Sequence, residues 1–130
     1  MDKTHILVVD DDVALSQLVG ITLEKTRLYT VKVENRSTNA LTTARAFKPH
    51  LVLLDVDMPG MDGGEVAAQL RADPTLAQVP IIFFTSLLSQ SEAGTGLSRR
   101  GGELYLPKPI DTGVLVRSLE SVLNELPATA

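Results

Sequence analysis

The sequence predicts an α/β fold in which a doubly wound parallel sheet carries helices on both faces. Short apolar runs rich in Val, Leu and Ile alternate along the chain with segments of helical periodicity. Such runs are typical of strands buried on both faces of a parallel sheet. Because the connections are short, we expect right-handed strand–helix–strand crossovers that build one five-stranded sheet.

Each expected element has its own local signal. Asp12, Ser37 and Asp111 stand where helix caps are expected, and Lys48-Pro49 ends a helix because the residue before proline disfavours the helical region. Asp62, beside Gly63, has the chemistry of a turn residue. The expected strands cover 4–9, 29–33, 51–54, 81–84 and 103–106, and the expected helices cover 13–25, 37–47, 65–72, a segment starting at Ser89, and 112–126.

Composition narrows the class of protein. The chain has 130 residues, of which 44% are hydrophobic and 22% charged, which suits one globular domain. It has no cysteine, so disulfides and thiolate metal sites are excluded. The net charge is −4 and Arg99-Arg100 is the one adjacent basic pair, which argues against direct nucleic-acid binding. No apolar run is long enough for a membrane span or a secretory signal, so we expect a cytoplasmic protein.

The carboxyl ends of the expected strands carry the residues with useful chemistry. In a doubly wound sheet these ends meet at one edge, where the functional crevice lies. We therefore expect several carboxylates, one hydroxyl and one ammonium to gather there: Asp10, Asp11, Asp55, Asp57, Thr85 and Lys108.

Crowded carboxylates repel one another, and a cation relieves that repulsion. Mg²⁺ is the natural choice, because it prefers carboxylates, water and phosphate oxygens as ligands. Lys108 adds a positive charge and Thr85 a hydroxyl donor. An aspartate in this setting, such as Asp55, is suited to accept a phosphoryl group.

Four motifs together resemble the receiver domain of two-component response regulators. The resemblance runs from about residue 4 to residue 126, and it implies a flavodoxin-like fold with strand order 2-1-3-4-5. It further implies a receiver domain over 1–126, with 127–130 as a tail or the start of a linker. The motifs are Ile-Leu-Val-Val-Asp-Asp-Asp at 6–12, Leu-Leu-Asp-Val-Asp-Met-Pro-Gly-Met-Asp-Gly at 53–63, Thr85-Ser86, and Tyr-Leu-Pro-Lys-Pro at 105–109.

The resemblance implies a phosphorylation site and its metal. Asp55 would receive the phosphoryl group from a histidine kinase or a histidine phosphotransfer protein, and the domain would later hydrolyse its own acyl phosphate. Asp10, Asp11 and Asp55 would hold Mg²⁺, or alternatively Mn²⁺, with the backbone carbonyl of Asp57 as a further ligand.

The resemblance also implies a switch. Thr85 and Lys108 would bind the phosphoryl oxygens, and Tyr105 would turn inward as Thr85 moves. The change would alter a face made by the fourth helix, the fifth strand and the fifth helix, which a downstream protein or output domain reads. The Lys108–Pro109 bond would be cis, as it often is in the family.

Three residues near the site depart from the commonest family pattern. Asp57 places a carboxylate where many relatives have a neutral or basic residue, which would tighten Mg²⁺ binding, repel the incoming phosphoryl group or alter its hydrolysis. Leu87 would shield the acyl phosphate from water. Ser86 replaces a small alanine and is expected to change little.

The fourth helix is a further departure. Ser89 and Glu92 form a capping-box pattern that starts a helix. Gly94 and Gly96 follow, and glycine costs about 1 kcal/mol relative to alanine in a helix interior. The sequence therefore predicts a short or partly melted helix.

Two other functions fit parts of the pattern. Asp55 and Asp57 after a strand, followed by Thr85 and Lys108, also match the motif order of haloacid-dehalogenase-type phosphatases, although the acidic pair precedes the nucleophile here and no cap domain fits. The second alternative is a receiver-like module that binds partners without phosphate. The chain is expected to be a monomer or a weak homodimer.

Overall fold

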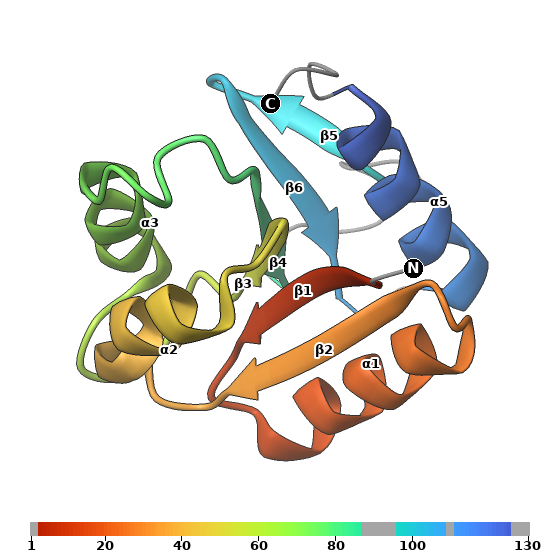
Figure 1. Cartoon of the computed structure of the whole chain (residues 1–130), viewed down its shortest axis with the longest axis horizontal. Helices are drawn as coiled ribbons and strands as arrows, with labels where there is room; N and C mark the ends of the chain where they lie inside the picture. Colours follow the sequence, from red (N-terminus) through yellow and green to blue (C-terminus); the bar gives the residue numbers. More distant parts are fainter. Residues whose placement is uncertain (1–2, 87–95, 109–110, 126–130) are drawn as a thin grey trace.

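A computed structural model describes residues 3–86, 96–108 and 111–125, and within these ranges the chain forms one sheet flanked by helices (Figure 1). The six strands lie in the order β2-β1-β3-β4-β6-β5. The strands are β1 (Thr4–Val9), β2 (Tyr29–Glu34), β3 (Leu51–Leu54), β4 (Ile81–Thr85), β5 (Ser98–Arg100) and β6 (Glu103–Pro107). The helices are α1 (Val13–Lys25), η1 (Ser37–Asn39, a 3₁₀ turn), α2 (Ala40–Phe47), α3 (Gly63–Ala72) and α5 (Thr112–Asn124).

The five parallel strands confirm the expected order 2-1-3-4-5, with β6 in the fifth place. Their register aligns the carboxyl ends, since Val9 pairs with Leu54 and Thr85 pairs with Pro107. The residues that follow these strands are therefore brought to one edge of the sheet.

A sixth strand corrects the prediction of five. β5 runs antiparallel to β6 at the edge of the sheet, with Ser98 opposite Tyr105. Gly101 and Gly102 join the strands with φ angles of 56° and 83°, and a two-residue hairpin turn with two positive φ angles favours glycine at both positions. β5 was not predicted from the sequence, because a strand of three residues is too short to show an alternation of apolar and polar side chains. The expected helix starting at Ser89 lies largely in 87–95, outside the described residues.

The core has two layers, one on each side of the sheet. Alternate residues of β1 point to opposite faces: Ile6 and Val8 join the cluster beneath α1 and α5, whereas Leu7 and Val9 join the cluster beneath α2 and α3. Figure 1 shows these two helix pairs on opposite sides of the strands. This double burial explains why the strand sequences are continuously apolar.

The helix ends confirm two predicted caps and correct two other interpretations. Asp12 accepts a hydrogen bond from the Leu15 amide, and Asp111 caps α5 in the same way. Ser37, in contrast, begins η1 and makes no capping bond, because its hydroxyl is engaged with the loop after β3. Asp62 is more than a turn residue: it forms a capping box with Glu65, so α3 begins at Gly63.

Candidate functional site

Three aspartates converge at the carboxyl edge of the sheet. Asp10 and Asp11 directly follow β1, and Asp55 directly follows β3 beside them, its amide donating to the Val9 carbonyl at 2.9 Å. One carboxylate oxygen of each lies within 4.8 Å of the others. Asp10 and Asp55 are buried while Asp11 is exposed, so the cluster opens to solvent on one side.

Lys108 joins this cluster from the end of β6. Its Nζ atom lies 2.6 Å from Oδ2 of Asp10 and 3.2 Å from Oδ1 of Asp55. The Lys108 amide donates to the Thr85 carbonyl at 2.9 Å, so the β4–β6 ladder continues up to the lysine. The side chain of Lys108 is only 11% exposed, and its position between two carboxylates is thus enforced by packing.

Burial and crowding change the acidity of the site. Burial, followed by repulsion from Asp10, raises the pKa of Asp55 from 3.8 to about 6, although Lys108 works in the opposite direction. Burial alone would lower the pKa of Lys108, but its contacts with Asp10 and Asp55 outweigh this effect and raise it. The lysine therefore stays charged at neutral pH, and the carboxylates hold more negative charge than one ammonium balances.

The donor set at this edge fits a hard divalent cation. The cluster offers carboxylate oxygens from two loops and no nitrogen or sulfur ligand, which is the preference of Mg²⁺ rather than of zinc. The raised pKa of Asp55 is the second indication, because a cation placed among these oxygens would lower the cost of ionising it. Asp10, Asp11 and Asp55 are the residues that would hold the ion.

The other predicted site residues lie at or near the same edge. Thr85 is buried at the end of β4, beside the start of the Lys108 segment, and Asp57 is exposed two residues after Asp55. Tyr105 is half-buried in β6, and its ring stacks on Phe83 at 5.3 Å between centroids. The predicted cis bond to Pro109 and the predicted effect of Leu87 lie outside the described residues.

Three residues that support the site were not identified by the sequence reading. A Cβ atom on Gly63 would come within 2.9 Å of the Val56 Cα and would collide with the Asp55 carbonyl, so only glycine permits this approach. The side chains of Asn35 and Ser37 contact the loops that carry the aspartates. Asn35 and Ser37 follow a strand in a polar stretch of sequence, where turn residues are the ordinary interpretation.

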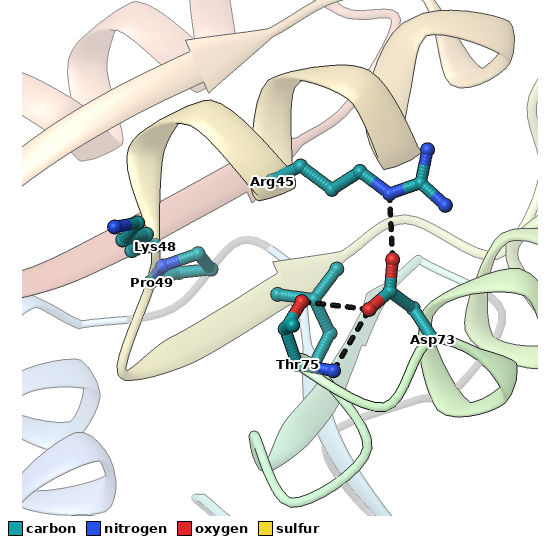
Figure 2. A pocket seen from close by; sticks show the side chains of 6 residues that line it. Arg45, Lys48, Pro49, Asp73 and Thr75 are labelled. Atoms are coloured by element: carbon teal, nitrogen blue, oxygen red, sulfur yellow. Dashed lines mark hydrogen bonds and ion pairs between the residues drawn. The ribbon is translucent and has the colours of Figure 1, made fainter.

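A surface hollow lies elsewhere in the fold. It has a volume of about 540 Å³ and is lined by Arg45, Lys48, Pro49, Asp73, Thr75 and Leu76, close to the amino end of β3 (Figure 2). The Asp73 carboxylate is fully used there, accepting from the amide and hydroxyl of Thr75 and from Nε of Arg45. These bonds, those of Thr75 first, lower the pKa of Asp73 to about 2. This hollow is at the opposite end of the strands from the acidic cluster and takes no part in it.

The fold and site together define a class of protein: a doubly wound α/β domain of the receiver type, with an acidic cluster at the carboxyl edge of its sheet. The family model for the response regulator receiver domain matches residues 6–120. The chain therefore belongs to the receiver domain family of two-component response regulators.

Curated relatives and solved structures agree with this assignment. Protein PilH of Pseudomonas aeruginosa is 33% identical over 119 residues, which cover 92% of this chain and 97% of PilH. The response regulator PleD of Caulobacter vibrioides is 39% identical, covering 95% of this chain and 28% of PleD. The chemotaxis protein CheY4 of Vibrio cholerae superposes with a TM-score of 0.79 at 27% identity, over 93% of this chain and 99% of CheY4.

Some relatives are considerably longer than this chain. The DNA-binding response regulator MtrA of Mycobacterium tuberculosis is 36% identical over 122 residues, but the chain spans only 51% of its length.

Among the described residues, no helix combines the length and apolar character needed to cross a membrane.

Proposed function

We propose that Asp55 is the phosphoacceptor of this receiver domain and that Asp10 and Asp11 hold the Mg²⁺ ion that assists the transfer. The observation that carries the proposal is the convergence of Asp10, Asp55 and Lys108 within hydrogen-bonding distance, from three separate strand ends. A buried carboxylate with a raised pKa beside a lysine has the character of a functional group rather than of a surface salt bridge.

The transfer requires little covalent chemistry from the protein. An oxygen of Asp55 forms a bond to phosphorus while the bond to the imidazole nitrogen of a phosphohistidine breaks, and the imidazole leaves with the electron pair. The bound metal would neutralise charge on the phosphoryl oxygens. Lys108, already 3.2 Å from Asp55, supplies the second positive charge, and positioning accounts for most of the rate. Attack of water on the resulting acyl phosphate returns the domain to its resting state.

The signal would leave the site through Thr85 and Tyr105. Thr85 stands at the end of β4 and Tyr105 lies on the neighbouring strand β6, where it stacks on Phe83. A phosphoryl group on Asp55 favours the packed state in which Thr85 reaches it, and Tyr105 then turns inward. A downstream partner or output domain reads the changed face that includes β6 and α5.

The donor would be a histidine kinase or a histidine phosphotransfer protein in the cytoplasm. α1 starts immediately after the acidic loop and exposes Val13, Leu18 and Ile21 by 50%, 61% and 53%. Such an apolar surface beside the phosphoacceptor suits a helical partner that presents its phosphohistidine over Asp55. We propose that the domain itself contacts no nucleic acid and that it is a monomer or a weak homodimer.

The test is intact mass after incubation with acetyl phosphate and Mg²⁺, for the wild type and for Asp55→Asn. We expect one phosphoryl adduct that requires both Asp55 and Mg²⁺, or release of inorganic phosphate with the same requirements if hydrolysis is fast. Neither adduct nor release would refute the proposal. Turnover of small phosphate esters would instead indicate a phosphatase, a function that the family assignment does not favour.

A further inference from the structure

The segment after β2 contacts both of the loops that carry the acidic cluster. The sheet order places β2 next to β1 but not next to β3. Nevertheless, the chain from Asn35 to Ser37 reaches the loop after β3, so it crosses over the carboxyl end of β1. We call Asn35 and Ser37, with their side-chain bonds to these loops, the 35–37 clamp.

Asn35 holds the first loop. Its Nδ2 atom donates to the backbone carbonyl of Asp10 at 2.7 Å and to the hydroxyl of Ser16 at 2.9 Å. The Ser16 hydroxyl donates in turn to the Val13 carbonyl at 3.1 Å, so it must accept from Asn35. Both acceptors therefore require an N–H donor, which sets the orientation of the amide and excludes an ionised aspartate as a substitute.

Ser37 holds the second loop. Its hydroxyl donates to the Pro59 carbonyl at 3.1 Å and accepts from the Met61 amide at 3.2 Å. Ser37 is only 4% exposed, so these two hydrogen bonds are shielded from competing water. Pro59 and Met61 follow Asp55 and Asp57 within one short loop, which is the loop expected to supply the remaining ligands.

We infer that the 35–37 clamp is a positioning device that holds the two ligand-bearing loops at the spacing that Mg²⁺ needs. The inference rests on the proposed metal site. Mg²⁺ demands near-ideal octahedral geometry, so loops that must first be brought together bind it less tightly than loops already fixed. Asn35 and Ser37 touch the backbone of these loops and leave the carboxylates free. They act on the ion only through the position of Asp10 and of the 55–61 loop.

The test measures Mg²⁺ affinity by calorimetric titration without any phosphodonor, for Asn35→Ala, Ser37→Ala and the double variant. Removing groups that orient metal ligands typically costs about tenfold or more in affinity, and we expect about tenfold for each single variant. Asn124→Ala and Ser121→Ala are matched controls, because both residues are exposed on α5, which makes none of the clamp contacts. All titrations are done at a temperature where urea denaturation shows each variant fully folded, so that loss of fold does not imitate loss of affinity.

Two further results separate the clamp from a general structural effect. Ser37→Thr keeps the hydroxyl and is expected to bind Mg²⁺ more tightly than Ser37→Ala. Hydrogen exchange of the Met61 amide should accelerate in Ser37→Ala and not in Ser121→Ala. Dissociation constants for Asn35→Ala and Ser37→Ala within twofold of the controls would overturn the inference while leaving the metal site intact. A wild type that binds no Mg²⁺ would overturn both the proposed metal site and the clamp. Phosphorylation of Asp55 is tested separately, by the intact-mass experiment with acetyl phosphate.

Discussion

Replacing Asp55 by asparagine should stabilise the metal-free domain. The wild-type carboxylate is 9% exposed as a side chain and shares its site with Asp10, so its charge is held at a cost to the folded state. Asparagine has nearly the same shape and no charge, and its carbonyl can still accept from Lys108. The substitution therefore removes repulsion without opening a cavity.

The size of the effect follows from the acidity of the group. The pKa of Asp55 is about 6 against an ordinary value of 3.8. One pKa unit corresponds to about 1.4 kcal/mol, so ionisation costs the folded state up to about 3 kcal/mol at neutral pH. The amide replaces one acceptor oxygen by an N–H donor, which offsets part of this gain. We therefore expect a net increase in the free energy of unfolding of about 1–3 kcal/mol, or a rise in Tm of about 3–10 °C for a domain of this size.

The stability gain of Asp55→Asn should depend on pH and on Mg²⁺, which distinguishes an electrostatic cause from a change in packing. Between pH 3.8 and about 6 the folded protein binds more protons at Asp55 than the unfolded chain does, so wild-type stability from this group falls as pH rises. Urea denaturation in EDTA should therefore show a larger gain for Asp55→Asn at pH 7.5 than at pH 5. Excess Mg²⁺ should stabilise the wild type more than the variant and narrow the gap.

Asp57→Asn serves as the control, because it removes an exposed carboxylate two residues away. Its free energy of unfolding should stay within about 0.5 kcal/mol of the wild type. Equal gains for both variants, or a gain for Asp55→Asn that does not change with pH, would refute the argument that burial and crowding raise the pKa of Asp55.

Other substitutions probe the neighbourhood of the site. Gly63→Ala forces a Cβ into the backbone of the preceding loop, so it should cost more than about 2 kcal/mol by urea denaturation, whereas Gly64→Ala, which meets only a side chain at 3.3 Å, should cost far less. Lys108→Gln removes the cation that competes for the carboxylates, so calorimetry should show tighter Mg²⁺ binding while mass spectrometry shows a lower yield of phosphoryl adduct; a normal yield would exclude a role for Lys108 in transfer. Arg71→Ala breaks a partly exposed ion pair with Glu103 and should cost at most about 1 kcal/mol. The pKa of Glu103 is lowered by Arg71, so this stabilisation is present at neutral pH and lost on acidification through that pKa, and an effect that grows at acidic pH would contradict it.

The sequence alone determined the type and order of the main elements, because these depend on local patterns. Continuous apolar runs indicated buried parallel strands, and the caps at Asp12 and Asp111 marked helix starts that the structure confirms. The same patterns placed Asp10, Asp11 and Asp55 at strand ends, so their proximity followed from the topology of a parallel sheet.

Features that depend on contacts between residues far apart in the sequence became visible only in the folded structure. Lys108 contacts Asp10 across 98 positions of sequence. The pKa of Asp55 is raised because packing buries its carboxylate and places Asp10 beside it. Ser37 looked like a helix cap, yet its hydroxyl bonds a loop 22 residues away. The hairpin of β5 was hidden because three residues carry no period, and it forms through pairing with β6. Burial and long-range hydrogen bonds are properties of the assembled fold, and no local window of sequence contains both partners.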